Sequence, residues 1–140
     1  MRPVYDEKVC IVHEDVSRIL FSEQDLSNRV AEMGSAITRD YADATREEGL
    51  ILISVLRGAA IFMADLAREI KLPLEMDYMA ISSLEVATLL RKKTPDQADV
   101  KCRYVGFECP DEFIVGYGLD YAERYRNLPY IGVLKPELYQ

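Results

Sequence analysis

The chain has 140 residues, 49% of them hydrophobic and 29% charged, so it is long enough for one folded domain with a real core. Its net charge of −7 and its pI of about 4.8 disfavour nucleic acid and anionic membrane as main partners, because both carry charge of the same sign. No apolar run approaches the ~18 residues that span a bilayer, and the first residues contain no apolar signal core, so we expect a cytoplasmic protein.

Metal-binding residue types are scarce. The three cysteines, Cys10, Cys102 and Cys109, are odd in number and lack CxxC spacing, and His13 is the only histidine. We therefore expect reduced, mostly packed cysteines and no metal ion bound directly by cysteine or histidine.

The first part of the chain predicts a short strand and then a long helix. Residues 9–12 have the composition of a strand. Ser22 followed by an acid at Asp25 is the pattern of a helix N-terminus, in which the hydroxyl and the carboxylate cap each other's backbone amides. One apolar stripe of helical spacing follows: Leu26, Val30, Met33, Ile37 and Tyr41.

The next segment predicts two parallel strands joined through a helix. Residues 50–56 are a continuous apolar run, which is expected of a central strand covered on both faces. Residues 59–70 predict a helix, and Pro73 precedes a second strand at 74–81. The helix is expected to pack through Ile61, Phe62, Leu66 and Ile70. This order of elements is typical of a parallel α/β sheet.

A break in this pattern follows at Ser82-Ser83. Residues 84–90 predict another strand, but only these two serines separate it from the strand before. Parallel neighbours need a crossover of a dozen or more residues, and a tight hairpin favours Asn-Gly, Asp-Gly or paired glycines. The residues alone therefore indicate an absent crossover, an unusual hairpin or one long bent strand.

The last third predicts a basic loop at 91–95, a strand at 104–107, a glycine-punctuated segment at 113–121 and a final strand at 130–134. Repeats, low-complexity tracts and linkers are absent from the sequence, so we expect one domain over residues 1–140. The turn at Arg57-Gly58 lies between a strand and a helix, where backbone amides can receive an anion, although the same pattern is also that of an ordinary tight turn.

The sequence from residue 105 to 121, VGFECPDEFIVGYGLDY, closely resembles a pattern of the hypoxanthine-guanine phosphoribosyltransferase family, VGF-x-x-P-x-x-F-x-VGY-x-LDY, and an arginine follows at Arg126. The resemblance extends through residues 85–93, 76–83 and 55–59 and so covers nearly the whole chain. It implies a phosphoribosyltransferase-type α/β fold, with a twisted, mostly parallel sheet flanked by helices. It also implies purine salvage: transfer of a phosphoribosyl group from phosphoribosyl pyrophosphate to hypoxanthine or guanine, with Mg²⁺, by a homodimer or homotetramer.

The resemblance assigns a purine site. Phe113 corresponds to the aromatic residue that stacks on the base, a role that suits a flat apolar ring. Lys92 corresponds to the donor to the exocyclic oxygen, which would select oxo-purines over adenine. Ile114 corresponds to a residue whose backbone contacts the base edge. Taken singly, Phe113 is better explained as a core side chain and Lys92 as a solvated loop charge.

The resemblance also assigns a pyrophosphate site. Leu56, Arg57 and Gly58 correspond to the pyrophosphate loop, and Arg126 corresponds to a guanidinium that clamps the phosphates. Asp120 corresponds to the acid near the magnesium ion. Taken alone, Asp120 and Arg126 are better explained as a surface ion pair. The whole set of residues at family spacing favours a site instead.

The chain departs from the family between Ser83 and Leu84, where the mobile loop and a central βα unit are expected. The family motif of two adjacent acids, which opens the loop that cradles the ribose 5-phosphate, has no counterpart in the sequence. We therefore expect no retained catalytic acid and weak turnover. The alternatives are a purine- and pyrophosphate-binding remnant without catalysis, and a structural remnant that oligomerises or misfolds; a nucleic-acid-binding regulator is disfavoured by the pI.

Overall fold

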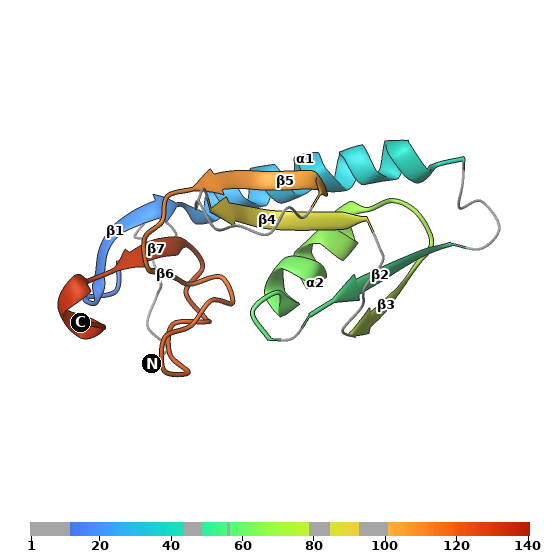
Figure 1. Cartoon of the computed structure of the whole chain (residues 1–140). Coiled ribbons are helices and arrows are strands. Elements are labelled where there is room, and N and C mark those ends of the chain that lie inside the picture. The colour runs from blue at the N-terminus through green and yellow to red at the C-terminus, as the bar shows by residue number, and fades with distance from the viewer. Residues whose placement is uncertain (1–11, 44–48, 56, 79–84, 93–100) are drawn as a thin grey trace, which may run out of the picture.

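The computed structural model describes residues 12–43, 49–55, 57–78, 85–92 and 101–140 (Figure 1). The elements in this part of the chain are β1 (Val16–Phe21), α1 (Glu23–Tyr41), β2 (Leu50–Ser54), α2 (Ala60–Glu69), β3 (Leu74–Tyr78), β4 (Val86–Lys92), β5 (Cys102–Cys109), β6 (Ile114–Val115), β7 (Ile131–Leu134) and a 3₁₀ turn, η1 (Pro136–Leu138). Parallel strand pairs accompanied by helices agree with the predicted α/β class. Of the two described α-helices, neither has the length and apolarity to cross a bilayer.

Helix α1 begins as the sequence predicts. The Ser22 hydroxyl accepts from the Asp25 backbone N–H at 3.1 Å, and the Asp25 carboxylate accepts from the Ser22 N–H at 2.9 Å. The predicted stripe is buried at Leu26, Val30, Met33 and Ile37, and Tyr41 is partly buried at its end. A capping box and one apolar face, both readable from the local sequence, therefore account for the position of this helix.

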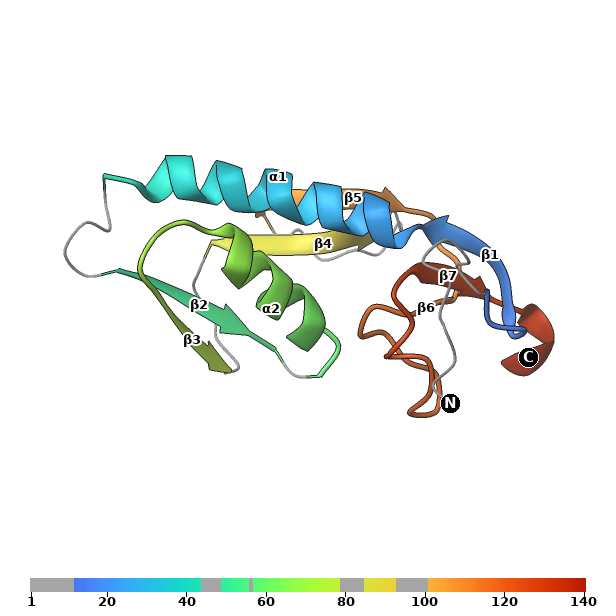
Figure 2. The same ribbon diagram turned by 180° about the vertical axis from the view of Figure 1, so that it is seen from behind.

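The described strands form three sheets instead of the single sheet that we expected. β2 pairs in parallel with β3, and β4 pairs in parallel with β5. β1, β7 and β6 form an antiparallel sheet in that order. Two opposite views place β2 between β3 and β4, with α1 running along β4 and β5 (Figures 1 and 2). Within the described residues, β2 and β4 each pair along one edge only.

The prediction that residues 50–56 are covered on both faces is wrong for the described part of that run. Ile51 is 61% exposed, and Val55, just after β2, is 67% exposed. Met76 and Tyr78 on β3 are also exposed. The run is apolar enough for a central strand, but a strand is buried only where other elements cover it. Among the described residues, Leu50 and Leu52 pack against the core on one face of β2.

The buried residues of helix α2 differ in part from those that we predicted. Leu66 and Ile70 are buried and Phe62 is partly buried, as expected, but Ile61 is 37% exposed and Met63 is buried at 3%. The two helices approach closely at Gly34, where a Cβ atom would overlap the side chain of Glu69.

The remaining boundaries differ from the sequence expectations at several points. β1 (16–21) was not predicted, and residues 9–11 of the predicted first strand lie outside the described residues. β4 continues through Arg91 and Lys92, which we expected in a loop, and β5 is longer at both ends than residues 104–107. The Ser83–Leu84 junction also lies outside the described residues.

Candidate functional site

Lys92 stands at the last position of β4, level with Cys109 of β5. Its Nζ donates to the backbone carbonyl of Glu112 at 2.7 Å and lies 3.7 Å from the Asp111 carboxylate. An ammonium group has three N–H donors, and the carbonyl occupies one of them. Lys92 therefore keeps donors for a ligand at the C-terminal edge of this strand pair.

Phe113 follows Glu112 and enters the short strand β6. Its carbonyl accepts from the Leu134 N–H at 2.8 Å, which ties the backbone to β7. The Phe113 ring stacks on Tyr139, with centroids 4.8 Å apart, and meets Tyr121 edge-on at 5.3 Å. The residue is still 36% exposed, so it is not a core side chain. Ile114, the next residue, is held by pairing with Val133.

These contacts bring the predicted base-binding residues together. The Glu112 carbonyl that binds Lys92 belongs to the peptide that leads into Phe113, so the cation and the aromatic ring lie at one turn. We name Lys92, Phe113 and Ile114, with Tyr121 and Tyr139, the aromatic cluster. A flat exposed ring beside an N–H donor suits a planar heterocycle that carries an acceptor oxygen.

A second group of predicted residues lies on the loop between β6 and β7. Arg126 donates to the Gly118 carbonyl at 2.7 Å and pairs with the Asp120 carboxylate at 3.0 Å. Arg57 reaches the Glu123 carboxylate at 3.2 Å, although both side chains are about 70% exposed. We name Arg57, Asp120, Glu123 and Arg126 the arginine–carboxylate cluster. Two guanidinium groups in one cluster are suited to binding an anion with several oxygens.

The turn at Gly58 and the β6–β7 loop touch through their backbones. A Cβ atom on Gly118 would overlap the carbonyl oxygen of Gly58, and Gly118 has φ of +96°. Only glycine combines this conformation with so close an approach. The contact brings Arg57 beside the arginine–carboxylate cluster. Leu56, the first residue of the predicted pyrophosphate loop, lies outside the described residues.

The β6–β7 loop has an unusual backbone. Tyr117, Ala122, Glu123 and Tyr125 all have positive φ without being glycine. Such conformations are uncommon for residues with a Cβ and concentrate at functional sites. Cross-loop hydrogen bonds hold them, including those from the Tyr117 N–H to the Leu128 carbonyl and from the Gly118 N–H to the Arg126 carbonyl, both at 2.9 Å.

Asp120 alone does not make a closed metal site. One carboxylate oxygen pairs with Arg126, and the other accepts from the Glu123 N–H at 3.0 Å. The described residues contain no cluster of three or more His, Cys, Asp or Glu side chains placed to hold a metal ion. Mg²⁺ commonly takes one or two carboxylates and fills its shell with water and substrate phosphates. The single carboxylate fits that open arrangement and does not fit an all-protein cage.

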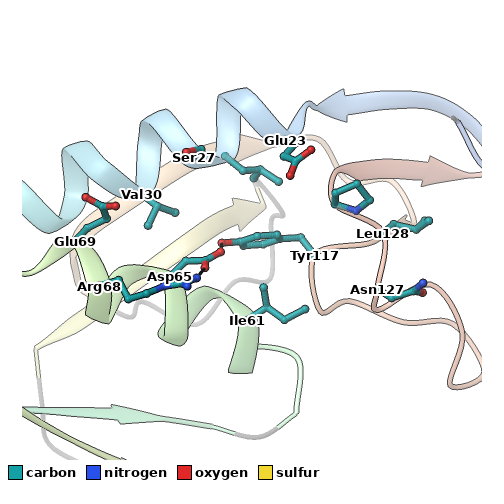
Figure 3. Close-up of a pocket in the computed structure, with 12 residues that line it drawn as sticks. Glu23, Ser27, Val30, Ile61, Asp65, Arg68, Glu69, Tyr117, Asn127 and Leu128 are labelled. Carbon is teal, nitrogen blue, oxygen red and sulfur yellow. Dashed lines mark hydrogen bonds and ion pairs between the residues drawn. The ribbon is translucent and has the colours of Figure 1, made fainter. Parts of the chain in front are cut away.

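A cavity of about 530 Å³ lies elsewhere, between α1, α2 and the β6–β7 loop (Figure 3). None of the seven described residues predicted for the site lines it. Figure 3 shows Tyr117 pointing at Asp65, with which its hydroxyl forms a hydrogen bond. Burial, followed by that hydrogen bond, raises the pKa of the Tyr117 hydroxyl. Three carboxylates, Glu23, Asp65 and Glu69, line the cavity together with one guanidinium, that of Arg68.

Sequence reasoning missed four contributors: Tyr121, Tyr139, Glu123 and Gly118. Tyr121 and Gly118 belong to the 105–121 motif, so a sharper reading of its glycine and tyrosine positions could have included them. Tyr139 and Glu123 join through tertiary contacts, for which the sequence gives no signal.

Hypoxanthine-guanine phosphoribosyltransferases resemble this chain in sequence and in structure. The chain is 36% identical to the hypoxanthine-guanine phosphoribosyltransferase of Staphylococcus epidermidis, over 91% of this chain and 99% of that protein. It matches the crystal structure of the Staphylococcus aureus hypoxanthine phosphoribosyltransferase with a TM-score of 0.81 and 33% identity, over 91% of this chain and 96% of that one. The Trypanosoma cruzi enzyme in complex with its product IMP matches with a TM-score of 0.83 and 26% identity, over 91% and 99%. No protein-family model matches the chain.

The alignment also shows a difference in length. It spans 181 positions against the Staphylococcus epidermidis protein, whereas this chain has 140 residues. The relative therefore has residues for which this chain has no counterpart.

Proposed function

Because the chain belongs to the hypoxanthine-guanine phosphoribosyltransferase family, we propose that it binds an oxo-purine at the aromatic cluster and pyrophosphate at the arginine–carboxylate cluster. The family function is purine salvage, in which a phosphoribosyl group passes from phosphoribosyl pyrophosphate to hypoxanthine or guanine, giving IMP or GMP and pyrophosphate. The single observation that carries the proposal is the position of the Lys92 ammonium on the carbonyl that leads into Phe113.

In the proposed base site, the purine lies on the Phe113 ring and the backbone of Ile114 contacts its edge. Lys92 donates to the exocyclic oxygen from an N–H that the Glu112 carbonyl leaves free. Hypoxanthine and guanine both present that acceptor, and adenine presents a donor there instead. The bound IMP of the Trypanosoma cruzi relative carries the same kind of base, which supports this class of ligand.

In the proposed pyrophosphate site, Arg126 and Arg57 donate to phosphate oxygens, and Gly58 lets the backbone approach them. Leu56, the first residue of the loop predicted from the sequence, would belong to the same site. A guanidinium has five N–H donors. The Nη1 of Arg126 donates to the Gly118 carbonyl and its Nη2 pairs with the Asp120 carboxylate, so N–H groups remain for the ligand. Asp120 would hold Mg²⁺ together with the phosphate oxygens. Magnesium, when bound, would supply positive charge against the pyrophosphate.

We propose that turnover by this chain is weak. The chain has no counterpart for part of its relative's sequence, and we place that gap at Ser83–Leu84, where the ribose-phosphate loop is expected. A sugar that is not held between base and pyrophosphate loses the rate advantage of positioning. The alternative is a remnant that binds purine and pyrophosphate without any catalysis. We further propose a single domain over residues 1–140, a cytoplasmic location and a homodimer or homotetramer.

The test compares binding with turnover. Calorimetric titration of the purified chain should show binding of hypoxanthine and of magnesium pyrophosphate. Chromatography of a reaction of hypoxanthine with phosphoribosyl pyrophosphate should show that this chain forms much less IMP than the Staphylococcus epidermidis enzyme does. Lys92→Met should weaken hypoxanthine binding about tenfold or more, since it removes a hydrogen bond from a charged donor. Lys101→Met, at an exposed lysine, is the matched control and should bind hypoxanthine as the unaltered chain does. Equal affinity for adenine and hypoxanthine would contradict the base site.

A further inference from the structure

Tyr139 lies far from the 105–121 motif in sequence but touches its central residue. Its ring stacks on Phe113 with centroids 4.8 Å apart and an interplanar angle of 26°. We infer that Tyr139 is a positioning residue of the purine site, holding the Phe113 ring in the orientation that receives the base; this inference rests on the proposed function.

The backbone of Phe113 is fixed, but its side chain needs a separate support. The Leu134 N–H binds the Phe113 carbonyl, and β6 holds Ile114, so the Cα position is set by the sheet. A phenylalanine that is 36% exposed has open space around its ring and would populate several χ1 rotamers on its own. The rings of Tyr139 and Tyr121 limit that choice, one by stacking and the other edge-on.

The turn that carries Tyr139 is held to the segment before β1. Its N–H donates to the Pro136 carbonyl at 3.2 Å, which closes the turn η1. The preceding Lys135 N–H donates to the Asp15 carbonyl at 3.0 Å, next to β1. The Tyr139 side chain packs against the core cluster that contains Tyr130 and Leu134. The ring is therefore a fixed surface on which Phe113 rests.

The geometry also indicates which side of Phe113 the base would use. An aromatic ring has two faces, and Tyr139 covers one of them. The remaining exposure of Phe113 leaves surface on which a purine can stack, so the base would extend a series of stacked rings that begins at Tyr139. Truncation of Tyr139 should cost base affinity without touching any group that binds phosphate.

The experiment measures two ligands on four variants of the full chain, by calorimetric titration with hypoxanthine and with magnesium pyrophosphate. Tyr139→Ala should weaken hypoxanthine binding about threefold to tenfold, the size expected of one aromatic pair, and leave pyrophosphate binding unchanged. Tyr139→Phe keeps the stacking ring and should restore the affinity. Leu138→Ala, at an exposed residue of the same turn, is the matched control and should bind both ligands normally. Phe113→Ala should lose hypoxanthine binding more strongly than Tyr139→Ala.

The outcomes separate the inference from the proposed function. If Phe113→Ala weakens hypoxanthine binding and Tyr139→Ala does not, the inference is overturned and the base site stands. If Tyr139→Ala weakens both ligands equally, or if Tyr139→Phe fails to restore hypoxanthine binding, a general structural role replaces the positioning role. If the unaltered chain does not bind hypoxanthine, or if Phe113→Ala binds it normally, the proposed function fails and the inference fails with it.

Discussion

The antiparallel sheet of β1, β7 and β6 and the parallel pair of β2 and β3 are both rich in apolar residues, but their surroundings differ. In the first region Tyr130, Ile131 and Leu134 are fully buried, each with 0% exposure. The β2–β3 region, including Val55, contains four of the eight large exposed hydrophobic residues of the described chain: Ile51, Val55, Met76 and Tyr78. Composition therefore does not explain the difference.

The neighbouring strands and side chains explain the difference in burial between the two regions. β7 lies between two hydrogen-bonded strands, and side chains from both ends of the described chain cover it. β2 has one paired edge among the described strands, and the relatives contain residues that have no counterpart here. Phe113, Ile114 and the β6–β7 loop of the proposed site belong to the first region. Arg57 and Gly58 follow β2 of the second, and Lys92 lies at the end of β4, outside both.

The largest expected difference between the two regions is in the cost of removing the same side chain. Ile131→Ala should lower the free energy of unfolding by about 2–5 kcal/mol, because it opens a cavity in a closed core. Ile51→Ala, at a residue 61% exposed, should cost less than about 1 kcal/mol. Urea denaturation of both variants measures this contrast. Equal costs would show that β2 is as well covered as β7, and would contradict the difference in burial between the two regions.

The next effect tests the contact that links the two regions. Gly118→Ala places a Cβ atom on the Gly58 carbonyl at a φ that disfavours it, and should cost about 1–3 kcal/mol of stability. By displacing Arg57 it should also weaken magnesium pyrophosphate binding in calorimetry. Gly58→Ala is the control for stability, because its added Cβ would lie 3.8 Å from the Gly118 carbonyl oxygen and from the Leu119 side chain, which is ordinary contact. A Gly118→Ala variant with unchanged stability and affinity would remove the contact from the site.

A third effect is the response to alkaline pH. Burial, followed by a hydrogen bond to Asp40, raises the pKa of Tyr104 from 10.0 to about 12. The unfolded chain loses this proton first, so the stabilisation is complete below pH 10 and is lost as the pH rises toward 12. Denaturation midpoints between pH 9 and 12, measured on the chain and on Tyr104→Phe, should show a smaller loss in the variant. A parallel loss in both would assign the alkaline transition to other groups, such as Tyr117, whose pKa burial also raises.

The smallest expected effect on stability is at the exposed strand pair. The double variant Ile51→Thr, Met76→Thr puts β-branched threonine, which suits a strand, at both exposed positions and should change the free energy of unfolding by no more than about 1 kcal/mol. It should reduce self-association, because exposed apolar surface favours it. Sedimentation at several protein concentrations measures the change in self-association. The contrasting variant, Met63→Thr, lies at a residue only 3% exposed and should destabilise the fold. Unchanged self-association would show that the copies meet through another surface.

Local sequence patterns predicted much of the fold. The capping box at Ser22 and the stripe from Leu26 to Ile37 located α1, because both signals act within a few turns of the chain. The same reasoning missed β1, and it placed Lys92 in a loop, because a strand's end depends on the partner strand that continues beside it. For Lys92 that partner is Cys109 on β5.

For the site, the sequence by itself determined the family and the residue types: an aromatic, a lysine and two arginines at family spacing. Tertiary structure decided which of them meet. It set Lys92 on the peptide before Phe113, brought Arg57 to Glu123 through two glycines, and added Tyr139, since contacts between distant segments depend on packing that no local pattern encodes. Burial was decided in the same way: β2 is apolar enough for a core, but whether a side chain is buried depends on the elements that cover it.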